Sequence, residues 1–339
     1  MDRKKAPRNG LIDFARLGLA GIVMMYHFYS GGKKHFPDGY MGVEFFVILA
    51  GFLMFSAWDR NHVSTLPVEE RQHYWLNYIK KRYVRFFWYC LIAFVLTFFV
   101  ARIWLGKLHG IAYICDILSE DIWEILLVKF LGFNRGAHLL NVPAWTLNCM
   151  LFAEFFVLGM FTFWKRQFLT FLMPLSVIFG AGYWMNVEDI AIKTVHIFFA
   201  FGMLHVYFLT CIGIFAHGIC KKLKEISFSK VGRYALTAAE LMGYGICVLI
   251  TLYRPFRYYR ACFILVATFV LAISFSGKSF AGSMLPANTF TNFCAELSLS
   301  LYLTHYPVLV VFRDILFKSV DINDLYRQKF IFLYCALAI

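Results

Sequence analysis

Residues 11–29 read LIDFARLGLAGIVMMYHFY, an apolar run that carries an arginine and a histidine. A run of about 20 apolar residues is long enough to cross a bilayer as a helix. Arg16 and His27 stand eleven positions apart in it. At ~1.5 Å and ~100° per residue, the two side chains share one helix face and lie roughly 16 Å apart along the axis.

Charged and titratable side chains inside a membrane are costly unless they face a partner or a wet cavity. A cation and a base at different depths on one face predict an anionic substrate whose reactive end lies away from its charge. The alternative is that the two residues are unrelated. Arg16 would then reach a lipid headgroup, and His27 would be hydrogen-bonded within a bundle.

Apolar runs of similar length recur along the chain, 60% of whose residues are hydrophobic, with a mean hydropathy of +0.65. We therefore expect an all-α protein, a polytopic membrane helix bundle with about ten transmembrane helices. The expected spans are residues 11–30, 40–58, 83–104, 145–164, 168–186, 194–219, 233–253, 257–276, 294–318 and 325–339.

Two segments depart from this pattern. Residues 124–133 are apolar but too short to span, which predicts an interfacial or re-entrant piece. The last span has only about fifteen residues, which suggests a trimmed chain or a partial helix. We expect residues 1–339 to form a single membrane domain with no appended soluble domain.

The net charge of +13 is concentrated in the loops. Basic and acidic loops alternate, which predicts a cytoplasmic N-terminus. Residues 253–260 break the alternation, so either the later spans are miscounted or their arginines contact an anionic group outside. No basic face belongs to a soluble domain, which argues against nucleic acid as a partner. The nine cysteines are scattered without a C-x-x-C pair, so we expect neither a metal site nor a disulfide framework.

His27 is the leading candidate for a general base, because a neutral imidazole accepts a hydroxyl proton near neutral pH. Glu44 lies one turn inside the second span, and the topology places it at a depth similar to that of His27. A carboxylate there would orient the imidazole. The alternative is a buried acid paired with a lysine or arginine.

Arg82 and Arg85 are three positions apart at the start of the third span and share a helix face. They could hold one phosphate group together; the alternative is topology anchoring. Trp145, Glu154 and His305 are candidate substrate contacts. The alternative for His305, which the residue taken alone favours, is a helix–helix hydrogen bond. His196 and His205 carry no second signal and are interpreted as structural.

Five motifs occur in order along the chain. They are Arg16-x10-His27, residues 39–52 (GYMGVEFFVILAGF), Arg82-x-x-Arg85, residues 143–147 (PAWTL) and residues 302–307 (YLTHYP). Together with the expected spans, this set resembles the acyltransferase-3 family of integral membrane acyltransferases. Members of that family transfer acetyl or other short acyl groups from acyl-CoA to hydroxyls, mostly on extracytoplasmic sugars and on lipid-linked or surface glycans.

The resemblance implies roles for individual residues. It makes His27 the catalytic base, assigns Arg16, Arg82 and Arg85 to the acyl donor, and places the family's acidic position at Glu44. The chain departs from the family pattern at Ala50, where many members have serine, at Trp88, where proline is common, and at Met150, where W-S-L-x-x-E members carry an acid.

We therefore expect an O-acetyltransferase of a bacterial cytoplasmic membrane. Its co-substrate should be an acyl-CoA, most simply acetyl-CoA. A carbohydrate is the expected acceptor, and no cofactor is bound permanently. One alternative is a proton-coupled transporter of a glycan or small anionic solute, which also needs titratable groups inside the membrane. Another is a non-catalytic partner of glycan assembly.

Overall fold

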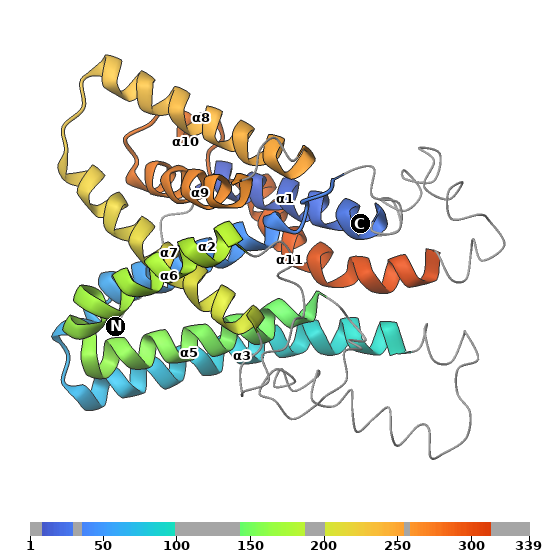
Figure 1. Ribbon diagram of the computed structural model, residues 1–339, viewed down its shortest axis with the longest axis horizontal. Coiled ribbons are helices and arrows are strands. Elements are labelled where there is room, and N and C mark those ends of the chain that lie inside the picture. The colour runs from blue at the N-terminus through green and yellow to red at the C-terminus, as the bar shows by residue number, and fades with distance from the viewer. Residues whose placement is uncertain (1–8, 30–35, 99–142, 187–200, 254–257, 313–339) are drawn as a thin grey trace.

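The computed structural model describes residues 9–29, 36–98, 143–186, 201–253 and 258–312. Throughout these ranges, the regular secondary structure is helical (Figure 1). The longer helices are α1 (Gly10–Tyr29), α2 (Met41–Arg60), α3 (Val68–Phe98), α5 (Ala144–Gln167), α6 (Met173–Asn186), α7 (Phe201–Glu225), α8 (Lys230–Leu252), α9 (Tyr259–Ser276) and α11 (Thr289–Val310). The short elements are η1 (Val63–Thr65), the π-helical turn η4 (Phe168–Leu172) and α10 (Ala281–Met284).

Six helical stretches in the described part of the chain are long and apolar enough to cross a membrane. They are Gly10–Phe28, Met41–Arg60, Ala144–Gly182, Gly202–Glu225, Lys230–Leu252 and Tyr259–Ser276. The chain is therefore a multi-pass, all-helical membrane protein. The expected count of ten spans stays a prediction, because residues 99–142, 187–200 and 313–339 lie outside the described residues. The segments expected at 124–133 and 325–339 lie in those ranges.

Three expected spans differ in detail from the structure. Those at 145–164 and 168–186 are α5 and α6, which η4 joins without a gap after a kink at Trp164 (φ −132°, ψ 40°). Ser176 of α6 bonds to Tyr207, near the start of α7, so α6 runs back along the bundle. The span expected from residue 83 is the second half of α3, which begins at Val68. Hydropathy missed the first half because it is polar, yet Trp75 packs against Gly159 and donates a hydrogen bond to the Phe155 carbonyl of α5.

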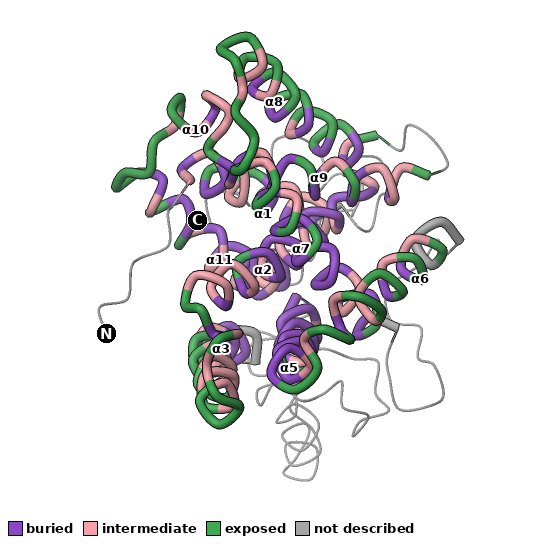
Figure 2. The backbone as a smooth tube through the Cα atoms, turned by 90° about the vertical axis from the view of Figure 1, so that its left-hand side faces the viewer, coloured by how far each residue is buried: buried purple, intermediate pink, exposed green. Residues whose placement is uncertain are grey.

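The core of the bundle depends on close backbone contacts. A Cβ atom at Gly51 of α2 would lie 2.5 Å from the Thr210 carbonyl oxygen of α7, and one at Gly213 of α7 would lie 2.2 Å from the Ile48 carbonyl oxygen. Glycine lets membrane helices approach this closely. Buried residues accordingly concentrate on α2, α5, α7 and α9, whereas α8 is exposed along much of its length (Figure 2).

The neighbours of α1 are set by contacts at its two ends. Gly10 lies against the carbonyl groups of Leu285 and Pro286, just before α11, while the Phe28 ring lies 5.8 Å from Phe312, just beyond α11. Helices α1 and α11 therefore run side by side in the same direction. Helix α2 runs antiparallel to α1.

At one end of the bundle, on the left in Figure 1, α2, α5, α7 and α9 end and α3 and α8 begin, and the sequence there is rich in basic residues. The ends of α2 and α7 meet there through Lys221 and Asp59 (3.1 Å), and the start of α8 meets the end of α9 through Arg233 and the Lys278 carbonyl (3.1 Å). The described cations near this end are Arg60, Arg71, Lys165, Arg166, Lys221, Lys222, Lys224, Lys230, Arg233 and Lys278, and the described acids are Asp59, Glu69, Glu70 and Glu225, so the end is basic on balance.

Candidate functional site

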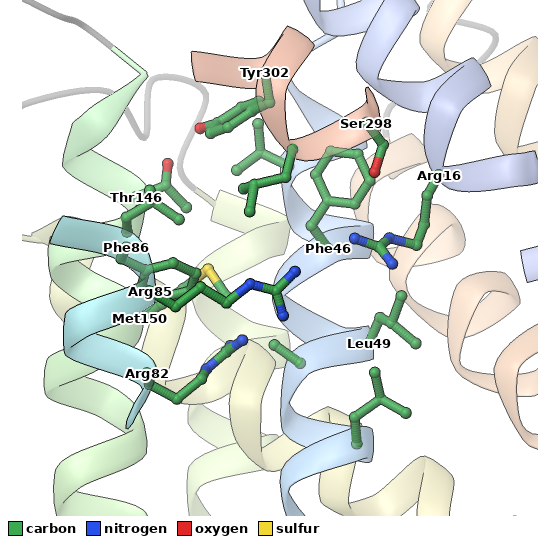
Figure 3. A pocket seen from close by; sticks show the side chains of 15 residues that line it. Arg16, Phe46, Leu49, Arg82, Arg85, Phe86, Thr146, Met150, Ser298 and Tyr302 are labelled. Carbon is green, nitrogen blue, oxygen red and sulfur yellow. The ribbon is translucent and has the colours of Figure 1, made fainter. Parts of the chain in front are cut away.

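A pocket of about 160 Å³ lies between α1, α2, α3, α5 and α11. Arg16 of α1 and Arg82 and Arg85 of α3 line it, and their guanidinium groups converge on the same space (Figure 3). The structure therefore brings together the three arginines that the sequence singled out. Most of the remaining wall is apolar, with Phe46 and Met150 among its side chains. Such a pocket combines an apolar cleft with cations suited to an anionic group.

Arg82 is held in place by Glu154 of α5. Its Nε donates to one carboxylate oxygen at 2.9 Å and its Nη2 to the other at 2.6 Å, which makes the pair bidentate. The Glu154 side chain is only 1% exposed, and the Arg82 guanidinium also lies over the Phe86 ring, 4.6 Å from its centroid. Glu154, expected as a substrate contact, is thus the partner of Arg82.

The other two arginines are less constrained. Arg16 has Asp13 of the preceding turn at 3.5 Å. Arg85 has an exposed side chain and forms no ion pair with any residue that the structure describes. Because the charge of Arg82 is neutralised by Glu154 and that of Arg16 partly by Asp13, Arg85 is the cation of this pocket with the most charge left for a ligand.

The far end of the pocket is formed by Tyr302 of α11, with Thr146 and Phe46 beside it (Figure 3). The Tyr302 hydroxyl donates to the Pro143 carbonyl at 2.9 Å. One turn further along α11 lies His305, whose ring centroid is 6.2 Å from that of Tyr302 and 5.2 Å from that of His27. A pair of histidines therefore lies directly beyond this end of the pocket.

The two histidines differ in their surroundings. His305 is fully buried, and its Nδ1 lies 3.0 Å from the Leu301 carbonyl oxygen. A carbonyl oxygen only accepts, so Nδ1 is a protonated donor in this contact. His27 is half-buried and also contacts the rings of Tyr26 (5.1 Å) and Tyr306 (6.4 Å). The setting of His27 is thus aromatic and partly accessible.

Comparison with protein-family models gives a match over residues 9–339, to the acyltransferase-3 model, which describes an acyltransferase domain. The chain belongs to this family. Comparison with curated proteins and with solved structures found no match. Because the family match covers all the helices described above, the arginine pocket and the histidine pair belong to a membrane acyltransferase.

In this acyltransferase, Glu44 lies away from His27. Gly42 packs against Leu19 and Val23 of α1, so Glu44, two residues further into α2, lies level with residues more than a turn short of His27. Its carboxylate faces α7, where Oε1 lies 3.2 Å from His205 Nε2, and both side chains are almost fully buried. Among the described contacts, none supports the predicted role of Glu44 in orienting His27.

Sequence reasoning missed the polar cluster around Glu44. The sequence shows no second signal beside His205, because its partner Glu44 lies on a distant helix. Arg260, at the start of α9, is buried and donates to the Tyr40 hydroxyl, and Tyr259 donates to Asp38 at 3.0 Å. Of the basic stretch 253–260, Arg260 thus has a partner inside the acyltransferase, while residues 254–257 lie outside the described part.

Trp145 does not line the arginine pocket. Its ring packs against Gly202 of α7, where an added Cβ atom would lie 3.0 Å from it. The neighbouring Thr146 faces the pocket instead. Side chains at adjacent helical positions point about 100° apart. Within the motif that begins α5, Trp145 therefore contacts α7 while Thr146 lines the pocket.

Proposed function

We propose that this acyltransferase moves an acetyl or other short acyl group from a cytoplasmic acyl-CoA to a hydroxyl of a surface or lipid-linked carbohydrate. The main support is the convergence of Arg16, Arg82 and Arg85 on one largely apolar pocket. A CoA thioester has phosphate groups at one end and an uncharged arm at the other. Guanidinium groups bind phosphate through charge-assisted hydrogen bonds, and the apolar wall suits the arm.

The proposed direction of transfer follows from the charge distribution. Positive loops mark the cytoplasmic side of membrane proteins, so the basic end of the bundle is assigned to the cytoplasm, together with the N-terminus. Arg16 lies six residues from the start of α1 at that end, whereas His27 lies eleven residues further toward the other end. The donor would enter from the basic end, and the carbohydrate would reach His27 from the opposite side, in a bacterial cytoplasmic membrane.

His27 is the proposed base. Its imidazole takes the proton of the acceptor hydroxyl while the oxygen attacks the thioester carbonyl carbon. The new C–O bond forms, the C–S bond breaks, and the CoA sulfur leaves with the proton returned by the imidazolium. Holding donor and acceptor on either side of His27 supplies the proximity that the reaction needs. Acyl-CoA acts as co-substrate, and no permanently bound cofactor takes part.

The proposal is tested by following free CoA from acetyl-CoA in the purified protein, reconstituted in lipid nanodiscs with membrane glycans. The wild-type protein should consume thioester, and His27→Ala should lose this activity while still inserting into the membrane. A proton-coupled transporter would release no CoA. Undiminished acylation by the His27→Ala variant would overturn the assignment of the base.

A further inference from the structure

The pocket and the histidine pair lie along the same two parallel helices. On α11, Ser298, Leu299 and Tyr302 line the pocket, and His305 follows one turn later. On α1, Arg16 lines the pocket and His27 contacts His305. Tyr302 therefore stands between the space where the arginines converge and the side chain proposed as the base.

The Tyr302 ring is fixed in this position. The side chain is 5% exposed, its hydroxyl is bonded to the Pro143 carbonyl at 2.9 Å, and the Phe46 ring packs edge-on at 6.1 Å. A buried aromatic side chain bonded at its tip has little freedom to rotate away. The ring thus keeps a fixed position at the histidine end of the pocket and narrows it.

We propose that Tyr302 determines which acyl group the enzyme accepts, by closing the histidine end of the pocket to all but short chains. This inference rests on the proposed function. When the acyl arm of the donor extends from the arginine side of the pocket toward the histidine pair, the acyl group passes the space bounded by Tyr302, Phe46 and Thr146. Each added methylene would then press against the Tyr302 ring.

The expected difference in affinity between short and long acyl-CoAs follows from how strongly apolar pockets discriminate between chain lengths. One methylene more or less changes selectivity about 10- to 200-fold. For the wild-type protein we expect hexanoyl-CoA to bind at least ten times more weakly than acetyl-CoA. Shortening the side chain at position 302 should remove most of this difference, because the ring no longer narrows that end.

The experiment measures the dissociation constants of acetyl-, butyryl- and hexanoyl-CoA for the full chain in nanodiscs. Tyr302→Ala should bring the hexanoyl-to-acetyl ratio to within about threefold of unity. Tyr302→Phe keeps the ring and loses only the bond to Pro143, so it should keep the wild-type ratio. Leu299→Ala enlarges the same pocket one turn away from its end, so it should also keep the ratio.

A wild-type ratio in Tyr302→Ala, or the same relaxation in Leu299→Ala, would overturn the inference. Tyr302→Leu, which retains much of the apolar volume, provides a second variant if the alanine variant does not fold; its ratio should lie between those of Tyr302→Phe and unity. Wild-type protein that binds no acyl-CoA at all would overturn the proposed function, and this inference with it. Acyl-CoA binding with a ratio insensitive to position 302 would overturn the inference alone.

Discussion

Breaking the ion pair between Glu154 and Arg82 should have opposite effects on stability and on the affinity for an anionic ligand. In Glu154→Gln, one acceptor oxygen remains for Arg82, but the negative charge that neutralises the guanidinium is lost. Removing one partner of a buried ion pair costs about 3–5 kcal/mol. Because the glutamine still accepts one hydrogen bond and Arg82 is 22% exposed, we expect a loss of about 2–3 kcal/mol in the free energy of unfolding.

The same substitution should tighten the binding of an anionic donor. The pocket gains one uncompensated positive charge. A unit charge roughly 6 Å from a phosphate contributes about 3 kcal/mol at an effective dielectric constant of ~20. Screening in a partly open pocket reduces this to about 1–2 kcal/mol, or roughly 5- to 30-fold in the dissociation constant.

The assay pairs thermal unfolding in detergent with a titration of free CoA. Glu154→Gln should unfold at a lower temperature than the wild type, yet bind CoA more tightly, and slower release of the product should lower kcat. Glu296→Gln, the same change at an exposed site on α11, should leave both properties unchanged. Weaker CoA binding by Glu154→Gln, or no change in it, would refute the reasoning that Arg82 faces the ligand.

Three further predictions concern the pocket and its surroundings. Arg85→Ala removes the least compensated cation of the pocket. Because hydrogen bonds between charged groups contribute ~1.5–3 kcal/mol, it should weaken CoA binding about 10- to 100-fold. Lys81→Ala, on the exposed side of α3, should have little effect, and equal effects of the two substitutions would contradict the role of Arg85. Ala50→Glu places a carboxylate in the pocket wall. It should weaken CoA binding at least tenfold, and unchanged affinity in a titration would contradict the assignment of this pocket to an anionic ligand. His205→Ala leaves the buried Glu44 carboxylate without its partner. It should lower the free energy of chemical unfolding by about 3–5 kcal/mol while leaving the affinity for CoA intact. A large loss of CoA affinity would contradict this, because the Glu44–His205 pair would then contribute to the binding of the ligand.

The chemistry of single helices could be predicted from the sequence. Arg16 and His27 share a run whose length and composition define α1, and Arg82 and Arg85 share a face because of their spacing alone. Hydropathy also located α2, α7, α8 and α9 to within several residues. These features depend on local periodicity, and a sequence expresses local periodicity directly.

The contacts between helices could not be predicted in the same way. Glu44 was matched to His27 on the assumption that α1 and α2 begin and end at equal depth. Gly42 instead packs against Leu19 and Val23, so α1 projects past the start of α2. Hydropathy sets helix depth only to within several residues, and a shift of one turn is enough to exchange one partner for another.

The ion pair between Arg82 and Glu154 is a second contact between helices that the sequence could not predict. Glu154 is 72 positions away in the sequence, and their contact depends on how α3 packs against α5. The signal that could have found it is the cost of burying a carboxylate in an apolar helix, which requires a cation nearby. That argument predicts a partner for Glu154, but it does not choose among the arginines and lysines of the chain.

The most direct measurement follows the transfer of label from radioactive acetyl-CoA to membrane glycan in inside-out membrane vesicles. It tests the identity of the donor, the direction of transfer and the role of His27 as the base in one assay. Vesicles with the wild-type protein should label the glycan, while those with His27→Ala or Arg85→Ala should label it weakly or not at all at equal protein level. Glycan labelling that persists at the wild-type rate in His27→Ala would contradict the proposed reaction.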